Sequence, residues 1–287
     1  RTHDSLLFFT DRGRVFQLKV WELPDSGRTA RGIPVINLIG IAPGETITAL
    51  LPVRDFASAR YLFMCTRNGR VKRTSLDQFA SVRSTGLIAI GLEEGDELAW
   101  VRLTSGNDEL ILVTEQGQAI RFQETDVRPM GRPAAGVIGI RMQPGDRVIA
   151  AEVVQPDQDL LVVSANGYGK RTALSEFRVQ GRGGQGVTAM KITERNGPVA
   201  AARVVTDTDS IMLVSQRGMV IRVPAEQISC IGRMTQGVSI MRLQEQDQVA
   251  SVTVIRTPED AEMADLEEAS ADTSETNDTA PDEAAGE

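Results

Sequence analysis

Residues 159–174 read DLLVVSANGYGKRTAL: an apolar run, a turn that ends at Gly167, and a second run that carries Lys170 and Arg171. An apolar run, a glycine turn and a further strand-like run are typical of a β-hairpin. Similar phrases occur five times, about every 50 residues, with turn glycines at Gly13, Gly69, Gly117, Gly167 and Gly218. A strand-patterned repeat of this length predicts a propeller-like array.

The second half of each repeat carries another glycine and two further predicted strands. This second glycine follows the turn glycine by 17 or 19 residues, at Gly32, Gly86, Gly136, Gly186 and Gly237. A short apolar or alternating segment comes next, such as IPVIN at 33–37, and a last apolar run follows a tight turn. Four strands per repeat predict an all-β array of four-stranded blades. No ten-residue stretch has convincing helical periodicity.

The repeats also set the expected domain boundaries. We expect five full repeats at about 6–55, 61–105, 109–155, 159–206 and 210–256, within a body of residues 1–256. Arg1–Ser5 reads as the remnant of a further repeat, and an opening Arg in place of Met predicts a piece of a longer chain. Residues 257–287 hold twelve acidic residues and no basic one, so we expect a disordered acidic tail there.

Charge is distributed unevenly between body and tail. The formal net charge is −8 for the whole chain but +4 for residues 1–256. The basic body suits an anionic ligand. The tail is then either a solubility segment or a competitor for that ligand, and in the second case shortening it tightens binding.

Several function classes are disfavoured by composition. The apolar runs are strand-sized and no secretory signal is present, which predicts neither membrane insertion nor export. Cys65 and Cys230 lie in different repeats without metal-ligand spacing, so we expect two buried thiols in a reducing compartment. His3 is the single histidine, and no phosphate-binding loop is present. We therefore expect no catalytic residue, metal or cofactor in this chain.

One glycine-rich loop matches the dinucleotide pattern G-x-G-x-x-G. That pattern should open a helix, whereas here it leads into VTAMKI, a predicted strand, so the dinucleotide interpretation is disfavoured. The loop consists of Gln180, Gly181, Arg182, Gly183, Gly184, Gln185 and Gly186.

Cations recur at equivalent places in the repeats. Any one of them could be the polar face of a strand, but scattered surface charge would mix signs at equivalent positions. The recurrence therefore predicts a basic band around one edge of the array, suited to a long polyanion. Because aromatic residues make up only 4% of the chain and are not interleaved, duplex DNA fits better than a single strand. The residues are Arg73, Arg121, Arg171 and Arg222 after the turn glycine, with Lys72 and Lys170; Arg28, Arg83, Arg132, Arg182 and Arg233 before the second glycine; and Arg141, Lys191 and Arg242 after it.

The phrases of this chain resemble a known family. The loop at 180–186 is similar to the box Gln-Arg-Arg-Gly-Gly-Lys-Gly of the C-terminal domain of bacterial DNA gyrase A, part of a type IIA topoisomerase. NGYGKRTALSEF, VTAMKITERNG, ISCIGRMTQGVSIMR and VFQLKVWELP extend the resemblance across residues 1–256, and the acidic tail is also of the family type. Gly181 and Gln185 replace the arginine and lysine of the full box, so this copy is degenerate.

The resemblance implies a β-pinwheel, a propeller-like ring whose neighbouring blades exchange an outer strand. It implies that the rim wraps duplex DNA and supports ATP-dependent negative supercoiling by an A2B2 holoenzyme of gyrase A and gyrase B. The catalytic residues, ATP and Mg²⁺ would belong to other parts of that bacterial, cytoplasmic and nucleoid-associated enzyme, and the isolated domain would be monomeric. The family carries the full box in its first repeat, so that repeat is expected upstream of this chain, and completing a stable wrap is expected to need it.

Two alternatives remain open. The type IV topoisomerase C-terminal domain is related, although the sequence is less similar to it. A protein-binding propeller platform is the other class, and it predicts a large exposed apolar or aromatic patch.

Overall fold

Strands and short 3-10 helices form the described part of the chain. The computed structural model describes residues 1–256 except 26, 28, 59 and 84. Runs rich in β-branched and aromatic residues pair across glycine turns, as expected for hairpins. The strands are β1 (Ser5–Thr10), β2 (Arg14–Lys19), β3 (Ile47–Val53), β4 (Tyr61–Thr66), β5 (Arg70–Ser75), β6 (Leu87–Ile88), β7 (Leu98–Thr104), β8 (Glu109–Thr114), β9 (Gln118–Gln123), β10 (Val137–Ile138), β11 (Val148–Val154), β12 (Asp159–Ser164), β13 (Tyr168–Ala173), β14 (Val187–Thr188), β15 (Val199–Val205), β16 (Ser210–Ser215), β17 (Val220–Pro224), β18 (Val238–Ser239) and β19 (Val249–Ile255). The 3-10 helices are η1 (Val20–Glu22), η2 (Val35–Asn37), η3 (Leu76–Phe79), η4 (Glu124–Asp126), η5 (Leu174–Glu176) and η6 (Ala225–Gln227).

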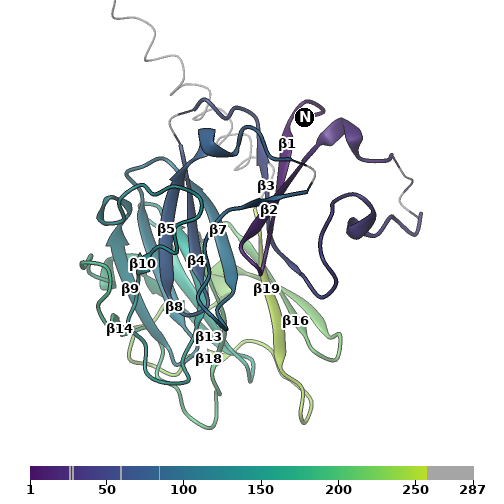
Figure 1. The fold of residues 1–287 in the computed structure, drawn as a ribbon. Helices are drawn as coiled ribbons and strands as arrows, with labels where there is room; N and C mark the ends of the chain where they lie inside the picture. The colour runs from purple at the N-terminus through teal and green to yellow at the C-terminus, as the bar shows by residue number, and fades with distance from the viewer. Residues whose placement is uncertain (26, 28, 59, 84, 257–287) are drawn as a thin grey trace, which may run out of the picture.

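Four of the sheets combine three strands of one repeat with a short strand of the next (Figure 1). The first blade has the order β3-β1-β2-β6, in which β6 comes from the second repeat. In the same way β10, β14 and β18 each add the outermost strand to the preceding blade. This exchange confirms the β-pinwheel that the resemblance implies.

Each exchanged strand is held in place by a close contact between the turn glycine of one repeat and a residue of the following repeat. In the fourth blade the exchanged segment lies so near Gly167 that an added Cβ would stand 2.2 Å from the carbonyl oxygen of Met241. The amide of Ile240 donates to the carbonyl of Gly167 at 2.9 Å. The residue that docks against each turn glycine, which we call the plug residue, is at most 2% exposed; the four docked plug residues are Ile90, Ile140, Met190 and Met241.

The two ends of the array lack this joint among the described residues. The fifth sheet has only three strands, β17-β16-β19, and an added Cβ at Gly218 would meet nothing within 4 Å. At the other end, the plug residue of the first repeat, Ile36, is 52% exposed. The strand expected at 33–37 is wrong: Val35–Asn37 forms the 3-10 helix η2. Its equivalents become strands by pairing with a preceding blade, and the described chain offers none to this segment.

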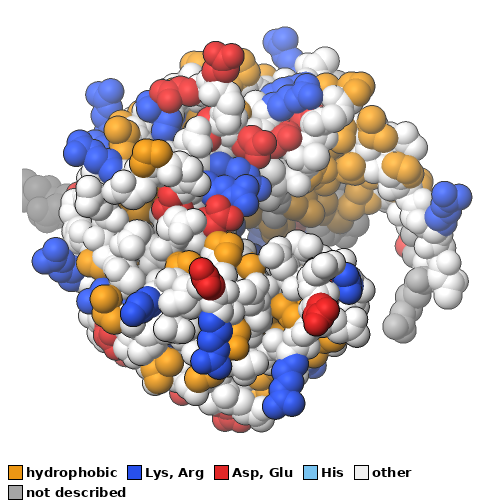
Figure 2. Space-filling view, turned by 90° about the horizontal axis from the view of Figure 1, so that it is seen from below, with side chains coloured by type: hydrophobic (Ala, Val, Ile, Leu, Met, Phe, Trp, Pro, Cys, Tyr) orange, Lys and Arg blue, Asp and Glu red, His pale blue; other side chains and the backbone are white. Residues whose placement is uncertain are grey.

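The apolar core is divided among the spaces between consecutive blades. Leu62, Met64 and Val101 of the second blade pack with Leu7 and Phe9 of the first in one cluster. The innermost strands also pack in sequence, β3 on β7, β7 on β11, β11 on β15 and β15 on β19. The blades therefore surround a channel lined by the innermost strands, and Figure 2 shows the molecule hollowed near its centre.

The leading side of the first blade is uncovered. Leu50 on β3 is 51% exposed, whereas its equivalent Val101 on β7 is fully buried against the first blade. The fifth blade therefore does not cover the first blade in the way that each blade covers its successor.

The expectation of two buried thiols is half wrong. Cys65 on β4 is fully buried, and burial raises the pKa of its thiol. Cys230 is exposed, because it lies on an outer loop after η6 rather than on a core strand. Among the residues that the structure describes, no helix has the length and apolar content to cross a membrane.

Candidate nucleic-acid interface

Loops along the outside of the array carry the recurrent arginines that precede the second glycine. These rim loops are residues 80–86 (except 84, which the structure does not describe), 129–136, 178–186 and 229–237, and they lie between η3, η4, η5 and η6 and the exchanged strands β6, β10, β14 and β18. They lie along the outer edge of the preceding blade: the amide of Met130 donates to the carbonyl of Arg73 at 2.9 Å, and that of Gln180 to Arg121 at 2.8 Å. These rim loops are therefore hydrogen-bonded to the preceding repeat as well as joined to their own, which holds them on the perimeter.

The rim loops carry Arg83, Arg132, Arg182 and Arg233, and the last three reach across to a neighbouring repeat. Arg132 Nη1 donates to the carbonyl of Gln78 at 3.1 Å. Arg182 donates from Nε to the carbonyl of Asp126 at 2.9 Å and from Nη1 to Ile138 at 3.2 Å.

Arg233 repeats that arrangement in the next loop. Its Nη1 donates to the carbonyl of Thr188 at 3.1 Å, and Glu176 lies 4.0 Å from its Nε. A guanidinium has five N–H donors, so these arginines keep donors for an anionic ligand. Arg83 is exposed and the other three are half-buried.

Other sequence-predicted cations also lie at the surface. The exposed residues are Arg141, Lys191, Arg222 and Arg242. Arg141 lies beside the glycine-rich rim loop, because its amide donates to the carbonyl of Gly184 at 2.8 Å. Arg222 lies on β17, where its Nη2 donates to Ser210 Oγ at 3.1 Å. Figure 2 shows blue side chains around the outline of the molecule, with red ones between them.

Two further exposed arginines lie here that the sequence pattern did not indicate. Arg128 directly precedes one rim loop and Arg178 begins the next, and they follow the buried residues Val127 and Phe177. Only two repeats carry arginine at this position, so recurrence did not reveal it. An exposed cation directly after a buried apolar residue was the available signal.

Lys72 and Lys170 are fully buried, which corrects the expectation that they belong to a surface band. Lys72 Nζ donates to the carbonyl of Ala89 at 2.6 Å and to that of Arg132. Lys170 Nζ donates to the carbonyls of Gly232 and Arg233 at 2.7 and 2.6 Å. A buried ammonium needs such acceptors, and here it ties a rim loop of the next repeat to the blade.

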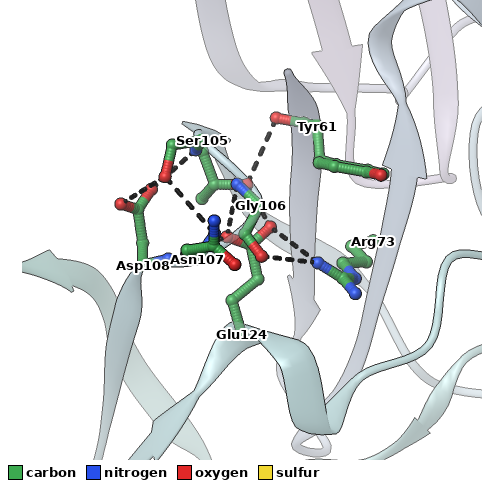
Figure 3. Close-up of polar contacts among 8 residues, drawn as sticks. Tyr61, Arg73, Ser105, Gly106, Asn107, Asp108 and Glu124 are labelled. Atoms are coloured by element: carbon green, nitrogen blue, oxygen red, sulfur yellow. Dashed lines mark hydrogen bonds and ion pairs between the residues drawn. The ribbon is translucent and has the colours of Figure 1, made fainter. Parts of the chain in front are cut away.

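Three of the four arginines after the turn glycine, Arg73, Arg121 and Arg171, are also largely internal, against the same expectation, and only Arg222 is exposed. Arg73 is 8% exposed; its Nη1 donates to the carbonyl of Gly106 at 3.0 Å, Glu124 lies 3.8 Å away, and its guanidinium stacks over Tyr61 (Figure 3). Glu124 is itself buried and accepts from the amide of Gly106 at 3.0 Å. The guanidinium therefore neutralises a buried carboxylate of the following repeat.

Arg121 and Arg171 show the same role in the next two repeats. Arg121 pairs with Glu109 and donates to the carbonyl of Leu174 at 2.7 Å. Arg171 pairs with Asp159 at 2.9 Å and donates to the carbonyl of Ile228 at 2.9 Å. Each arginine thus holds the 3-10 helix of the following repeat, and charge neutralisation inside the joint explains why the position is never acidic.

The buried lysines give the fold a pH dependence. Burial lowers the pKa of Lys170 from 10.5 to about 8, with Arg233 acting in the same direction and Glu176 against it. Because the unfolded chain binds this proton more tightly, stability rises with pH between about 8 and 10.5. We expect the unfolding free energy of wild type to gain about 2–3 kcal/mol over this range relative to Lys170→Met. Urea unfolding of both proteins across that range measures it, and parallel curves would contradict the assignment.

The degenerate box is a structural loop that carries one arginine, Arg182. An added Cβ at Gly186 would stand 2.3 Å from the carbonyl oxygen of Ala119, so this glycine lets the loop lie on β9. The amide of Gly183 donates to the carbonyl of Gly139 at 2.6 Å. The loop leads into the strand β14 rather than a helix, as expected.

Two expected features fall outside the described residues. Arg28 and the tail at 257–287 are among those that the structure does not describe. Within the described ranges, no group of three or more His, Cys, Asp or Glu side chains is placed to hold a metal ion.

The chain matches a family model described as DNA gyrase C-terminal domain, beta-propeller, over residues 4–54, 60–105, 108–155, 158–206 and 209–256. It is 52% identical over 259 residues to the DNA gyrase A protein of Halalkalibacterium halodurans, a match that covers 90% of this chain and 31% of that protein. It is 42% identical over 270 residues to the DNA gyrase A protein of Klebsiella oxytoca, covering 94% and 31%. The chain thus spans about a third of the length of these curated relatives.

Two solved structures are similar to the fold. A C-terminal domain of DNA topoisomerase IV superposes with a TM-score of 0.85 at 30% identity, covering 93% of this chain and 84% of that one. A DNA gyrase A C-terminal domain gives 0.76 at 28% identity, covering 89% and 83%.

Proposed function

This chain belongs to the DNA gyrase C-terminal domain family, and from that premise we propose that it binds, bends and wraps duplex DNA around its rim loops without reading the base sequence. Its place is the gyrase holoenzyme, where gyrase B and the rest of gyrase A in an A2B2 assembly supply ATP hydrolysis and strand passage. The wrapped DNA then favours negative supercoiling in the bacterial cytoplasm, at the nucleoid.

The observation that carries this proposal is the recurrence of rim-loop arginines that keep free donors. Arg132, Arg182 and Arg233 occupy equivalent places on successive rim loops and spend few of their N–H groups on backbone carbonyls. A curved row of such guanidiniums matches the phosphates of a bent duplex, and phosphate contacts position DNA without specifying its sequence.

The energy of bending requires many contacts at once. Bending some 40 bp through about 180° costs on the order of 10 kcal/mol for a smooth elastic rod, more than any single contact supplies. At least eight surface cations are available on the second to fifth repeats for this purpose: Arg83, Arg128, Arg132, Arg141, Arg178, Arg182, Lys191 and Arg233.

A single-stranded ligand fits the surface less well. Tyr61 and Tyr168 are half-buried and their rings are stacked by Arg73 and Arg195. Trp21 is 52% exposed, but it is a single ring on η1. The described rim therefore offers no row of free aromatic rings for base stacking.

Salt dependence tests the phosphate contacts. About eight contacts predict that the logarithm of the association constant falls with the logarithm of salt concentration with a slope near −7. Fluorescence anisotropy with 40-bp duplexes of two unrelated sequences, titrated between 50 and 300 mM salt, measures both slope and sequence preference. A slope shallower than about −3, or a strong preference for one duplex, would contradict the proposal.

A role as the C-terminal domain of type IV topoisomerase is the second candidate, favoured by the higher TM-score of 0.85. The sequence identities of 52% and 42% to gyrase A proteins favour gyrase. Fusion of residues 1–287 to a gyrase A protein that lacks this domain separates the two. ATP-dependent negative supercoiling by the fusion supports the gyrase role, and relaxation without supercoiling supports the alternative.

A further inference from the structure

The innermost strands place a charged ring at one level of the central channel. Arg102, Glu152, Arg203 and Thr253 occupy equivalent register positions on β7, β11, β15 and β19, opposite Phe63, Ile111, Leu161 and Met212. Glu152 accepts from Arg102 Nη2 at 2.9 Å and from Arg203 Nη1 at 3.1 Å. One carboxylate is thus shared by two guanidiniums.

The charge of this ring is not balanced by the residues around it. A cavity of about 440 Å³ is lined by Arg102, Glu152 and Arg203 together with Arg256, which follows β19. Its wall therefore carries three arginines and one glutamate. The side chains of Arg102 and Arg203 are 28% and 31% exposed, so an entering anion can reach them. Arg256 is exposed and takes part in none of the ion pairs found among the described residues.

The chain itself supplies an anion at this place. Twelve acidic residues and no basic one follow Arg256, and the first two, Glu259 and Asp260, lie three and four residues beyond it. An extended chain advances at most about 3.6 Å per residue, so these carboxylates stay within roughly 15 Å of Arg256. Tethering gives them an effective concentration in the millimolar range at the cavity.

We propose that the acidic segment beginning at residue 257 docks in the mouth of the central channel, against Arg102, Arg203 and Arg256. Docking neutralises the excess positive charge of the ring and links the second, fourth and fifth blades through one peptide. It also keeps the first part of the tail away from the rim loops, several strands further out. This inference does not depend on the proposed binding of DNA.

Paramagnetic relaxation in the full chain tests the docking. A nitroxide is attached at Ala269→Cys in a Cys230→Ser background, since Cys65 is buried and Cys230 exposed. At 50 mM salt we expect enhanced relaxation of the amides of Arg102, Glu152 and Arg203, falling at least threefold in 0.5 M salt. In Arg102→Gln/Arg203→Gln/Arg256→Gln the enhancement falls at least threefold at low salt.

Two matched variants keep the test decisive. Arg256→Gln alone removes an exposed side chain without an ion pair, so it folds normally and lowers the enhancement in the channel. Arg83→Gln/Arg132→Gln/Arg182→Gln removes three cations from the rim, as many as the triple channel variant removes, and leaves the relaxation enhancement in the channel unchanged. Enhancement at the rim loops that only the rim variant abolishes, or channel enhancement insensitive to salt and to Arg256→Gln, would overturn the proposal.

Discussion

Replacing Arg132, Arg182 and Arg233 by glutamate lowers the affinity for duplex DNA by about 10³-fold at 0.1 M salt. Each lost phosphate contact forfeits the release of about 0.9 counterion, worth roughly eightfold at this salt concentration, and the introduced carboxylates add repulsion. Fluorescence anisotropy on one 40-bp duplex measures the loss. Because these side chains are half-buried and spend few donors on backbone carbonyls, circular dichroism should show an unchanged fold.

The control changes net charge equally at the hairpin-turn end of the blades. Arg12, Arg195 and Arg217 are exposed and lie in or beside turns rather than on rim loops. Their replacement by glutamate should cost less than about 30-fold, through long-range electrostatics alone. Equal losses in the two triple variants would mean that affinity follows net charge and that the rim loops have no special part.

Gly167→Ala destabilises the fold by about 2–5 kcal/mol, whereas Gly218→Ala costs only about 1–2 kcal/mol. Both glycines end hairpin turns with positive φ, 79° and 85°, so an alanine brings the same backbone strain of about 1–2 kcal/mol. At Gly167 the new Cβ also meets the carbonyl oxygen of Met241 at 2.2 Å, and at Gly218 it meets nothing within 4 Å. Forcing the exchanged segment outward adds about 1–3 kcal/mol, as overpacking does elsewhere.

Urea unfolding followed by circular dichroism compares the two variants directly. The difference between them isolates the joint between blades, because turn type and strain are matched. Equal destabilisation would show that the exchanged segment contributes little to stability, contrary to its burial around Met241.

The sequence predicted the hairpins well because their signals are local. An apolar run and a turn glycine within 16 residues define each hairpin, and the structure has strands at all five. The exchanged strand is only two residues long, as in Val187–Thr188, so alternation could not assign it to a neighbouring blade. That assignment came from the family resemblance. IPVIN has the pattern of its equivalents and still forms a 3-10 turn, because strand formation there depends on a partner.

The candidate site was predicted in part, for a similar reason. Lysine and arginine are usually exposed, so Lys72 and Arg73 appeared to belong to a surface band. Their burial depends on carbonyls and a carboxylate that the sequence places up to 60 residues away, at Arg132 and Glu124. Recurrence identified positions at which every repeat needs a similar side chain, but not the reason for the need. At the rim loops, a recurring cation is compatible with binding an anionic ligand. After the turn glycine, the cation is needed for the contact between successive repeats.

Ligation of nicked circular DNA in the presence of the chain tests wrapping most directly. A ligase seals the circles at increasing protein concentration, and the linking number of the deproteinised product is read on a gel. Even a partial wrap around the rim, without the further repeat that a complete stable wrap is expected to need, predicts a positive shift that grows with protein and is absent with Arg132→Glu/Arg182→Glu/Arg233→Glu. An unchanged linking number at saturating occupancy, shown by a parallel binding measurement, would contradict the account.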